Sequence, residues 1–409
     1  MPYSGTVSGP TTYGRPDRPP SPGVYGSPRQ APPAPPSRGS GRRARKRRDP
    51  LWAKLLVIFG ALLMMASGGS IVGTKALVAR YTSTINRVDG LPDHQGKVAF
   101  DGPINILLVG IDTRNNPGEL IRSDTIMIVH IPASHDQAYL VSIPRDTDVQ
   151  IPAFPTTGYQ GGREKINAAF AFGSQGKGGW GGGLKLLAET IKQMSGISFD
   201  AAAIIDFDGF RKVVEALGGV HMCIDEETTS LHIGIDRNGK YAPPYRTSDG
   251  LHFTRVPGVK PMVYKPGCRD LAPWEALDYV RQREFIPDGD YGRQRHQQQF
   301  IKAIAKKAMS AGVLSNPAKL DRVIKAAGSA LTVDFGGADV LDWMFTLKNV
   351  GDNSMVMIKT NGGHYQSVKV NGQDRETLSP ESQQLFQAVR DDKVPDFIIQ
   401  HPDWVSKDS

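Results

Sequence analysis

Short apolar runs and longer apolar periodicities alternate along residues 101–397 of this chain. The short runs occupy 104–111, 125–131, 138–143, 201–207 and 355–358. Apolar residues at helical spacing begin near 165 and recur at 183–194, 208–217, 273–280, 290–309 and 380–390. Runs of about four to eight apolar residues predict buried strands, and a period of about 3.6 predicts helices. Because the two kinds of element alternate, a layered α/β sandwich around a mixed sheet is the expected fold.

Stretches rich in glycine and proline separate these elements and predict loops. The glycine-rich segment 173–183 lacks the Gly-x-x-x-x-Gly-Lys-Ser/Thr spacing of a P-loop, so it is interpreted as a flexible surface segment. Residues 225–265 are interpreted as a long polar excursion. Asp208 is expected to cap the helix that follows it, although Asp206 and Asp208 also have the Asp-x-Asp spacing of glycosyltransferase metal sites.

The N-terminal part of the chain has a different composition. Residues 1–50 hold 12 of the 30 prolines and almost no aliphatic side chains, which predicts a disordered tail. Leu55 to Val72 then runs 18 residues without a charge, long enough to cross a hydrocarbon core, so 51–74 is predicted to be a transmembrane anchor. Six basic residues at positions 42–48 orient the N-terminus to the cytoplasm.

The rest of the chain is therefore expected outside the cell membrane, behind a single span. It divides into a polar stalk at 75–100, a folded domain at 101–397 and a tail at 398–409. A cleaved signal peptide is the alternative to an anchor, but its basic region would be about 50 residues long, and signal peptides are far shorter than that.

The positive charge belongs to the tail and not to the folded part. The formal charge is +8, but residues 1–54 carry 11 Lys/Arg and 2 Asp/Glu, so the remainder sums to about −1. A nucleic-acid-binding domain carries its excess charge on the fold. The basic run before the span could itself be a nucleic-acid patch, but its position beside the membrane explains it, and no nucleic-acid partner is expected.

The two cysteines, Cys223 and Cys268, both lie in the part expected outside the cell. Two thiols in an oxidising compartment predict one disulfide, and two free thiols are the alternative. Their spacing supports no zinc site.

Polar residues suited to a site stand at the ends of the first three apolar runs. Asp112 follows the first run, Asp124 precedes the second and Arg145 follows the third. If the three strands run up, down and up, these side chains meet at one edge of the sheet. The simpler interpretation is that the two aspartates cap turns.

A second polar group follows an apolar helical run. Asp290, Arg293 and Gln297 are spaced by three and four residues, so they share one helical face. The free N–H groups at the start of that helix also suit an anion. Taken singly, Asp290 is a good N-cap, Arg293 an ordinary solvated residue and Gln297 a buried amide.

Arg281 and Arg283 stand just before that helix. Two residues that are two positions apart on a helix point in different directions. If both arginines bind one ligand, we therefore expect the preceding helix to end near Val280 and the two arginines to lie in an extended segment. Guanidinium groups match phosphate geometry through two parallel hydrogen bonds. Surface salt bridges are the alternative role.

Together these groups have the composition that phosphoryl transfer requires. That reaction asks a protein for positioning and charge neutralisation, with carboxylates for Mg²⁺ and arginines for phosphate oxygens. The chain contains no Gly-x-Ser-x-Gly or His-Glu-x-x-His sequence, and its nine histidines have no metal-ligand spacing.

The segments that carry these residues closely resemble the LytR–CpsA–Psr family. The matching segments are Asn-Ile-Leu-Leu-Val-Gly-Ile-Asp-Thr-Arg (105–114), Arg-Ser-Asp-Thr (122–125), Ser-Ile-Pro-Arg-Asp (142–146), Lys-Ile-Asn-Ala-Ala-Phe (165–170), Gly-Gly-Val (218–220), Ala-Leu-Asp-Tyr-Val-Arg-Gln-Arg (276–283) and 290–300. The resemblance covers about residues 104–310, and seven motifs in order make it specific.

The resemblance implies a three-layer α/β/α sandwich with a mixed central sheet and an apolar pocket for a polyprenyl chain. It also implies a phosphotransferase of the Gram-positive envelope that depends on Mg²⁺ (or Mn²⁺). Such enzymes move a glycopolymer, such as teichoic acid, capsule or arabinogalactan, from a polyprenyl-pyrophosphate carrier to a muramic acid hydroxyl of peptidoglycan.

The resemblance further implies roles for single residues. Asp112 and Asp124 would bind the metal, and Asp290 would orient the arginines or help to deprotonate the acceptor. The pyrophosphate would be held by Arg145, Lys165, Arg281, Arg283, Arg293 and Gln297. Some members carry a further basic residue where this chain has Val149, so the resemblance does not carry that one head-group contact over to this chain. The cysteine pair resembles one branch of the family, whose cysteines form a disulfide.

Two other functions remain open from the sequence. The first is a pyrophosphatase that uses water as the acceptor. The second is a regulator without enzymatic activity, either a DNA-binding attenuator or a sensor of the lipid carrier. The sequence does not indicate the glycopolymer, the prenyl length or the oligomeric state.

Overall fold

The computed structural model describes most of residues 86–406; the gaps are 93–97, 114–119, 249–251, 311, 314–318, 320–321, 324, 327, 329–330, 348–349 and 351–353. The expected tail at 1–50 and anchor at 51–74 lie outside the described residues. Among the described helices, none combines the length and the apolar character that a membrane span requires.

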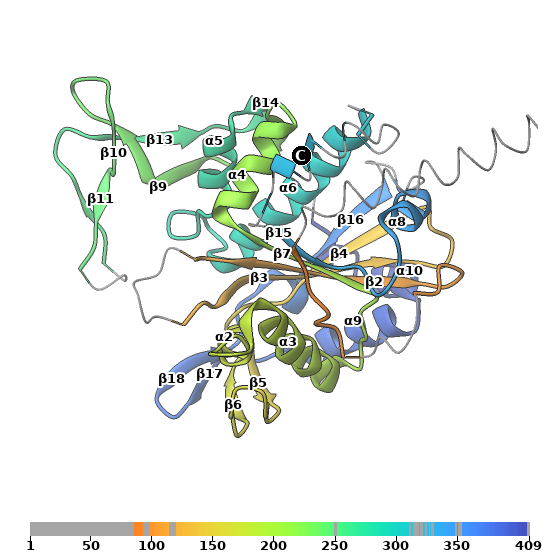
Figure 1. Cartoon of the computed structure of the whole chain (residues 1–409). Helices are drawn as coiled ribbons and strands as arrows, with labels where there is room; N and C mark the ends of the chain where they lie inside the picture. The colour runs from red at the N-terminus through yellow and green to blue at the C-terminus, as the bar shows by residue number, and fades with distance from the viewer. Residues whose placement is uncertain are drawn as a thin grey trace, which may run out of the picture. The chain divides into compact units, whose positions relative to one another are not determined.

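A seven-stranded mixed sheet forms the centre of the fold (Figure 1). Its strands, in spatial order, are β1 (Asn86–Arg87), β15 (Leu331–Asp334), β7 (Ala201–Asp206), β2 (Ile104–Ile111), β3 (Ser123–Ile131), β4 (Ala138–Ser142) and β16 (Met355–Ile358). β3 is antiparallel to both β2 and β4, whereas β7 is parallel to β2 and β16 is parallel to β4. The expected up, down and up course of the first three long strands is confirmed.

Helices cover both faces of this sheet (Figure 1). One face carries α4 (Phe207–Ala216), α5 (Pro273–Tyr279) and α6 (Asp290–Ser310), and the other carries α2 (Asn167–Gly173), α3 (Gly179–Ser195) and α9 (Pro380–Arg390). Leu107 and Val109 of β2 are buried with Phe170 and Leu187 in the larger core, under α2 and α3. Leu108, the residue between them, packs toward the opposite face. Because both faces of β2 are covered, the strand has a continuous apolar sequence.

The remaining helices and hairpins lie around this centre. The helices are α8 (Val340–Leu347) and α10 (Val394–Gln400), and two hairpins pair β5 (Asp148–Ile151) with β6 (Gly162–Lys165) and β17 (Ser367–Val370) with β18 (Gln373–Glu376). A further group of strands holds β8 (Val220–Ile224), β9 (Thr228–Ile235), β10 (Tyr241–Ala242), β11 (Tyr245–Arg246), β12 (Thr254–Arg255), β13 (Lys260–Tyr264) and β14 (Gly267–Leu271). The excursion expected at 225–265 contains five of these strands, β9 to β13, which the sequence interpretation did not include.

The glycine-rich segment 173–183 is also more ordered than expected. Helix α3 begins inside it, at Gly179. A Cβ atom on Gly173 would collide with the main-chain carbonyl of Gly182, and one on Gly183 would lie 2.9 Å from the carbonyl oxygen of Phe170. These glycines therefore allow α2 and α3 to pack closely, and their role is packing rather than flexibility.

Both ends of the described chain belong to the fold, which corrects two expected boundaries. Within the expected stalk, β1 pairs with β15, and the main-chain N–H groups of Gly90 and Leu91 donate to the buried carboxylate of Asp334. Within the expected C-terminal tail, Trp404 is buried against the core, and the N–H of Ser406 donates to the carbonyl of Met357.

The cap of α4 differs from the expectation by two residues. Asp206, and not Asp208, is the N-cap, because its Oδ1 accepts a hydrogen bond from the N–H of Gly209 at 2.8 Å. Asp208 lies in the first turn and forms ion pairs with Arg211 and Lys212 instead.

Cys223 and Cys268 lie directly opposite each other in the β8–β14 ladder, with their sulfur atoms at bonding distance, 1.95 Å. We expect neither thiol to react with an alkylating reagent in denatured, unreduced protein, and both to react after reduction. Mass spectrometry of the alkylated peptides measures this. Two labelled cysteines without reductant would contradict the disulfide.

Candidate active site

A cavity of about 370 Å³ lies between the sheet and the helices α4 and α6. On β7, Ala203 and Ile205 line the cavity, while Ala202 and Ile204 are buried in the core on the other face. This alternation follows from the two-residue period of a strand. The apolar lining is completed by Leu108, Met127, Phe207, Phe210, Val213, Leu277, Val280, Phe300, Ile301 and Ile304, among others.

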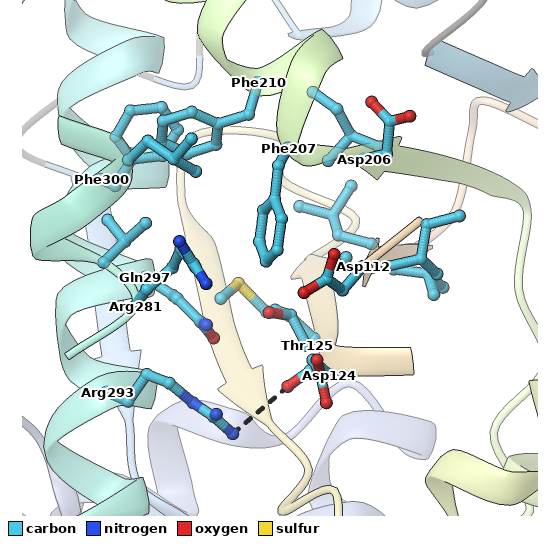
Figure 2. Close-up of a pocket in the computed structure, with 18 of the residues that line it drawn as sticks. Asp112, Asp124, Thr125, Asp206, Phe207, Phe210, Arg281, Arg293, Gln297 and Phe300 are labelled. Carbon is cyan, nitrogen blue, oxygen red and sulfur yellow. Dashed lines mark hydrogen bonds between the residues drawn. The ribbon is translucent and has the colours of Figure 1, made fainter. Parts of the chain in front are cut away.

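The cavity has an apolar end and a polar end (Figure 2). At the apolar end the rings of Phe210 and Phe300 stack with centroids 4.1 Å apart. At the polar end, Arg293 and Gln297 project from α6 on one side, opposite Asp112 and Asp124 on the other. One cavity thus offers an apolar surface that continues into charged groups.

The strand-edge prediction is confirmed. The Nη1 atom of Arg145 donates to Oδ1 of Asp124 at 2.6 Å, and Asp112 and Asp124 line the same cavity. Between β2 and β3 the register shifts, since Gly110 pairs with Thr125 and Ile111 pairs with Ser123. Asp124 is therefore the extra residue of a β-bulge, a feature that re-aims side chains beside functional sites.

The helical-face prediction is confirmed for Asp290 and Arg293. Arg293 Nη2 donates to Asp290 Oδ1 at 2.5 Å, Gln294 Nε2 donates to Asp290 Oδ2 at 3.0 Å, and Arg145 Nε lies 3.9 Å from Asp290 Oδ1. Asp290 thus joins the helix group to the strand-edge group. Burial would raise the pKa of Asp290, but Arg293 and Arg145 outweigh it and hold that pKa below its ordinary value.

Several arginines keep a donor unused. Among the described residues, the Nε atoms of Arg145, Arg293, Arg295 and Arg375 are buried and make no hydrogen bond, and of these four arginines Arg293 lines the cavity. Burial lowers the pKa of Arg293, whose side chain is 8% exposed, although Asp290 and Asp124 oppose this shift. Buried donors are normally satisfied, so the unused donor of Arg293 points to an anionic ligand at the polar end of the cavity.

For Arg281 and Arg283 we expected that the preceding helix ends near Val280 and that the segment then runs extended; the first expectation is confirmed and the second is wrong. Helix α5 ends at Tyr279, as expected, but Arg281 N donates to the carbonyl of Asp278 at 3.2 Å, so the segment turns rather than runs extended. Both arginines nevertheless line the cavity. The guanidinium carbon of Arg281 lies 4.5 Å from the centroid of the Phe207 ring, which fixes its plane at the cavity wall.

Gln297 lines the polar end of the cavity, as expected for its place on α6. Lys165 does not: its Nζ lies 3.3 Å from Asp146 Oδ1, and it is absent from the residues that line the cavity. Its expected contact with the pyrophosphate therefore stays a prediction without support from the cavity.

Residues 74–390 of the chain match the LytR_cpsA_psr family. The chain belongs to the LytR–CpsA–Psr family.

Two curated relatives agree with this assignment. The chain is 31% identical over 267 residues to the probable cell wall biosynthesis protein LcpB of Corynebacterium glutamicum. This match covers 62% of this chain and 53% of LcpB. It is 30% identical over 225 residues to the polyisoprenyl-teichoic acid–peptidoglycan teichoic acid transferase TagV of Bacillus subtilis. This match covers 55% of this chain and 48% of TagV. The chain spans about half the length of these two relatives.

Solved structures share the fold. The crystal structure of Bacillus subtilis TagV matches with a TM-score of 0.52 at 23% identity and covers 72% of this chain and 98% of that one. A structure of TagT bound to LI-WTA matches with a TM-score of 0.51 at 21% identity, over 76% of this chain and 98% of that one. This likeness confirms a mixed α/β fold around a central mixed sheet.

The carboxylates of this LytR–CpsA–Psr protein suit a magnesium site that is completed by substrate phosphates. The described residues contain no cluster of three or more His, Cys, Asp or Glu side chains able to hold a metal by themselves. Mg²⁺ is, however, commonly bound by one or two carboxylates together with substrate phosphates. Asp112 and Asp124, which line the cavity opposite the arginines, match that pattern.

Sequence reasoning missed most of the apolar lining. Phe207, Phe210 and Phe300 are spread over two helices, and the sequence shows them only as apolar positions in amphipathic patterns. Leu231 and His232, from β9, also line the cavity. The one available signal was the position of Phe300 one turn after Gln297, on the face already assigned to the site.

A buried carboxyl group lies beside the site. Glu376 is 1% exposed, and its Oε1 accepts hydrogen bonds from Tyr291 Oη and, at 3.1 Å, from Asn361 Nδ2. Burial raises its pKa from 4.5 to about 7, although these hydrogen bonds oppose the shift. Because the folded-state pKa is raised, the protonated group stabilises the fold below about pH 4.5, and this contribution is lost as the pH rises through about 7.

We therefore expect a pH-dependent difference between the parent protein and Glu376→Gln, whose amide keeps the hydrogen bonds but does not titrate. The free energy of unfolding of the parent, relative to the variant, should fall by about 3 kcal/mol between about pH 4.5 and 8. Chemical denaturation at several pH values measures this. A difference that is constant with pH would contradict the raised pKa.

Proposed function

We propose that this protein transfers a glycopolymer from a polyprenyl-pyrophosphate carrier to a hydroxyl group of peptidoglycan. The observation that carries the proposal is the single cavity that is apolar at the Phe210–Phe300 end and carries arginines and carboxylates at the other. A polyprenyl pyrophosphate has the same division into an apolar chain and an anionic head. The names of TagV and LcpB, which refer to teichoic acid transfer and cell wall biosynthesis, support the same class of reaction.

In the proposed reaction the acceptor oxygen attacks the phosphorus that carries the glycan. A new P–O bond forms, the bond to the bridging oxygen breaks, and polyprenyl phosphate leaves with the electron pair. Arg293, Arg281 and Arg283 bind the non-bridging oxygens, where negative charge gathers. Asp290 positions Arg293 and Arg145 through the ion pairs described above.

Asp112 and Asp124 would hold Mg²⁺, which would neutralise phosphate charge when bound. Arg145 now pairs with Asp124 at 2.6 Å, so this arginine would need to share the carboxylate with the ion. The predicted anchor at 51–74 would keep the cavity at the extracytoplasmic face of the cell membrane, where the lipid carrier and the wall meet.

The test is a transfer assay with the protein of residues 1–409 in detergent, a synthetic polyprenyl-pyrophosphate-linked glycan, peptidoglycan and Mg²⁺. We expect covalent attachment of the glycan to peptidoglycan, and its loss when the divalent cation is chelated. Release of free phosphoglycan in the presence of excess peptidoglycan would instead indicate a pyrophosphatase. Absence of any turnover by folded protein would indicate a non-enzymatic role.

A further inference from the structure

A second cavity, of about 360 Å³, adjoins the first at His232. It is more open than the first and is lined by His232, Ile233, Tyr241, Ala242, Pro243 and Trp274. His232, on β9, belongs to the lining of both cavities, so a molecule in the second cavity lies against a residue that also faces the first.

The imidazole of His232 is held by a buried carboxylate. Its Nδ1 atom lies 3.3 Å from Oδ1 of Asp278, which is 2% exposed and projects from α5. Tyr264 Oη donates to Oδ2 of Asp278 at 2.7 Å, and Gln282 Nε2 donates to Oδ1 at 2.9 Å. The carboxylate is thus fixed in place by three groups from different elements.

These bonds determine the tautomer of His232. Gln282 Nε2 also donates to the main-chain carbonyl of Asp278 at 2.8 Å, which occupies its second hydrogen. The Nδ1 atom of His232, although 3.2 Å from that amide nitrogen, is therefore the donor to Asp278. Its Nε2 atom keeps a free lone pair, which is the arrangement of a histidine base oriented by a carboxylate.

The position of this nitrogen suits a base. Among the described residues no hydrogen bond engages His232 Nε2, and the side chain is 34% exposed. Asp290, the carboxylate expected from the sequence to help deprotonate the acceptor, already accepts hydrogen bonds from Arg293 and Gln294. A carboxylate held in this way by donors is a weak base.

The second cavity has the surface of a sugar subsite. Tyr241 is 65% exposed, and its ring lies 5.2 Å from that of Trp274 at an angle of 57°. Exposed aromatic rings offer apolar faces together with a polar edge, which matches the faces and hydroxyl groups of a pyranose ring. Because His232 lines both this cavity and the first one, the sugar that fits here is the one that carries the attacking hydroxyl.

We propose that Tyr241 and Trp274 bind the acceptor sugar of peptidoglycan and that His232, oriented by Asp278, takes the proton from its hydroxyl group. This inference rests on the proposed transfer reaction. As the acceptor oxygen forms its bond to phosphorus, its proton passes to Nε2 of His232, and polyprenyl phosphate leaves with the electrons of the broken P–O bond. No other reactant is required.

The first experiment tests the base. His232→Ala should lower the transfer rate by about 10²- to 10⁴-fold, and added imidazole should restore part of it, because a free base can enter the space that the side chain leaves. His221→Ala is the matched control, since His221 forms a similar pair with Asp270 at 3.0 Å but lines neither cavity. Full activity of His232→Ala, or a loss that imidazole does not restore, would overturn the role of His232 as a base.

The second experiment tests the subsite. Tyr241→Ala and Trp274→Ala should each raise KM for a soluble peptidoglycan fragment by about tenfold and leave KM for the lipid-linked donor unchanged. A rise in the donor KM alone would show that the donor glycan occupies the cavity, and unchanged constants would show that it is not a subsite.

The transfer rate of the parent protein, measured beside the variants, distinguishes a failure of this inference from a failure of the proposed function. If the parent transfers no glycan, the proposed function itself fails. If it transfers glycan and these variants match it, the function stands and the inference is wrong.

Discussion

Replacing Arg293 by alanine is expected to lower the rate of glycan transfer by about 10²-fold or more. Arg293 contacts both the helix group and the strand-edge group of polar residues. Its Nη2 donates to Asp290 and lies 3.5 Å from the main-chain oxygen of Asp124 (Figure 2). Its buried Nε remains available to a ligand. The substitution removes a preorganised positive charge whose side chain is only 8% exposed, and a charge in such surroundings has a larger effect on the transition state than one in water.

Two variants make this prediction specific. Arg293→Lys keeps the charge but not the fork of donors, so we expect an intermediate rate. Arg211→Ala, on the exposed surface of α4, removes an arginine that pairs with Asp208 and does not line the cavity, so the rate should not change. Thermal unfolding of each variant separates a lost site from a lost fold. A folded Arg293→Ala variant with the parent rate would show that the phosphate-binding site has been misassigned.

The polar half of the site could be predicted because it depends on local rules. An apolar run of strand length predicts where a strand ends, and the direction of three consecutive strands then brings Asp112, Asp124 and Arg145 together. The spacing of Asp290 and Arg293 places them on one helical face without knowledge of the tertiary structure. The structure confirms both groupings and adds the contact of Asp290 that joins them.

The rest depends on contacts between distant segments, which periodicity does not report. The bulge at Asp124 arises from the pairing of β3 with β2, and β1 exists only because residues 86–87 find β15. Asp206 caps α4 because β7 ends directly at the helix, and sequence rules locate such boundaries only to within a few residues. His232 was passed over because its partner, Asp278, lies 46 positions away.

The apolar half of the cavity was invisible for a related reason. A strand covered on both faces has a continuous apolar sequence, so the pattern does not distinguish the face that packs against a core from the face that lines a cavity. On β7 the distinction is between Ala202, which is buried in the core, and Ala203, which lines the cavity. This difference leads to the second prediction.

Replacing Ala203 by tryptophan is expected to abolish high-affinity binding of a long polyprenyl phosphate. The indole would occupy the cavity of about 370 Å³ and exclude part of the prenyl chain. Burial of each CH₂ group contributes about 0.8 kcal/mol, so exclusion of one five-carbon unit should cost about 4 kcal/mol, or on the order of 10³-fold in affinity. Inorganic pyrophosphate, which has no chain, should bind to the arginines as tightly as before.

Isothermal titration of both ligands against the folded variant measures the two effects separately. Ala153→Trp is the matched control, because Ala153 is exposed and does not line the cavity, and it should bind both ligands like the parent protein. Equal weakening of both ligands in Ala203→Trp would indicate a general distortion of the site. Unchanged affinity for the polyprenyl phosphate would show that the chain does not occupy this cavity, and the observation that carries the proposed function would then lose its meaning.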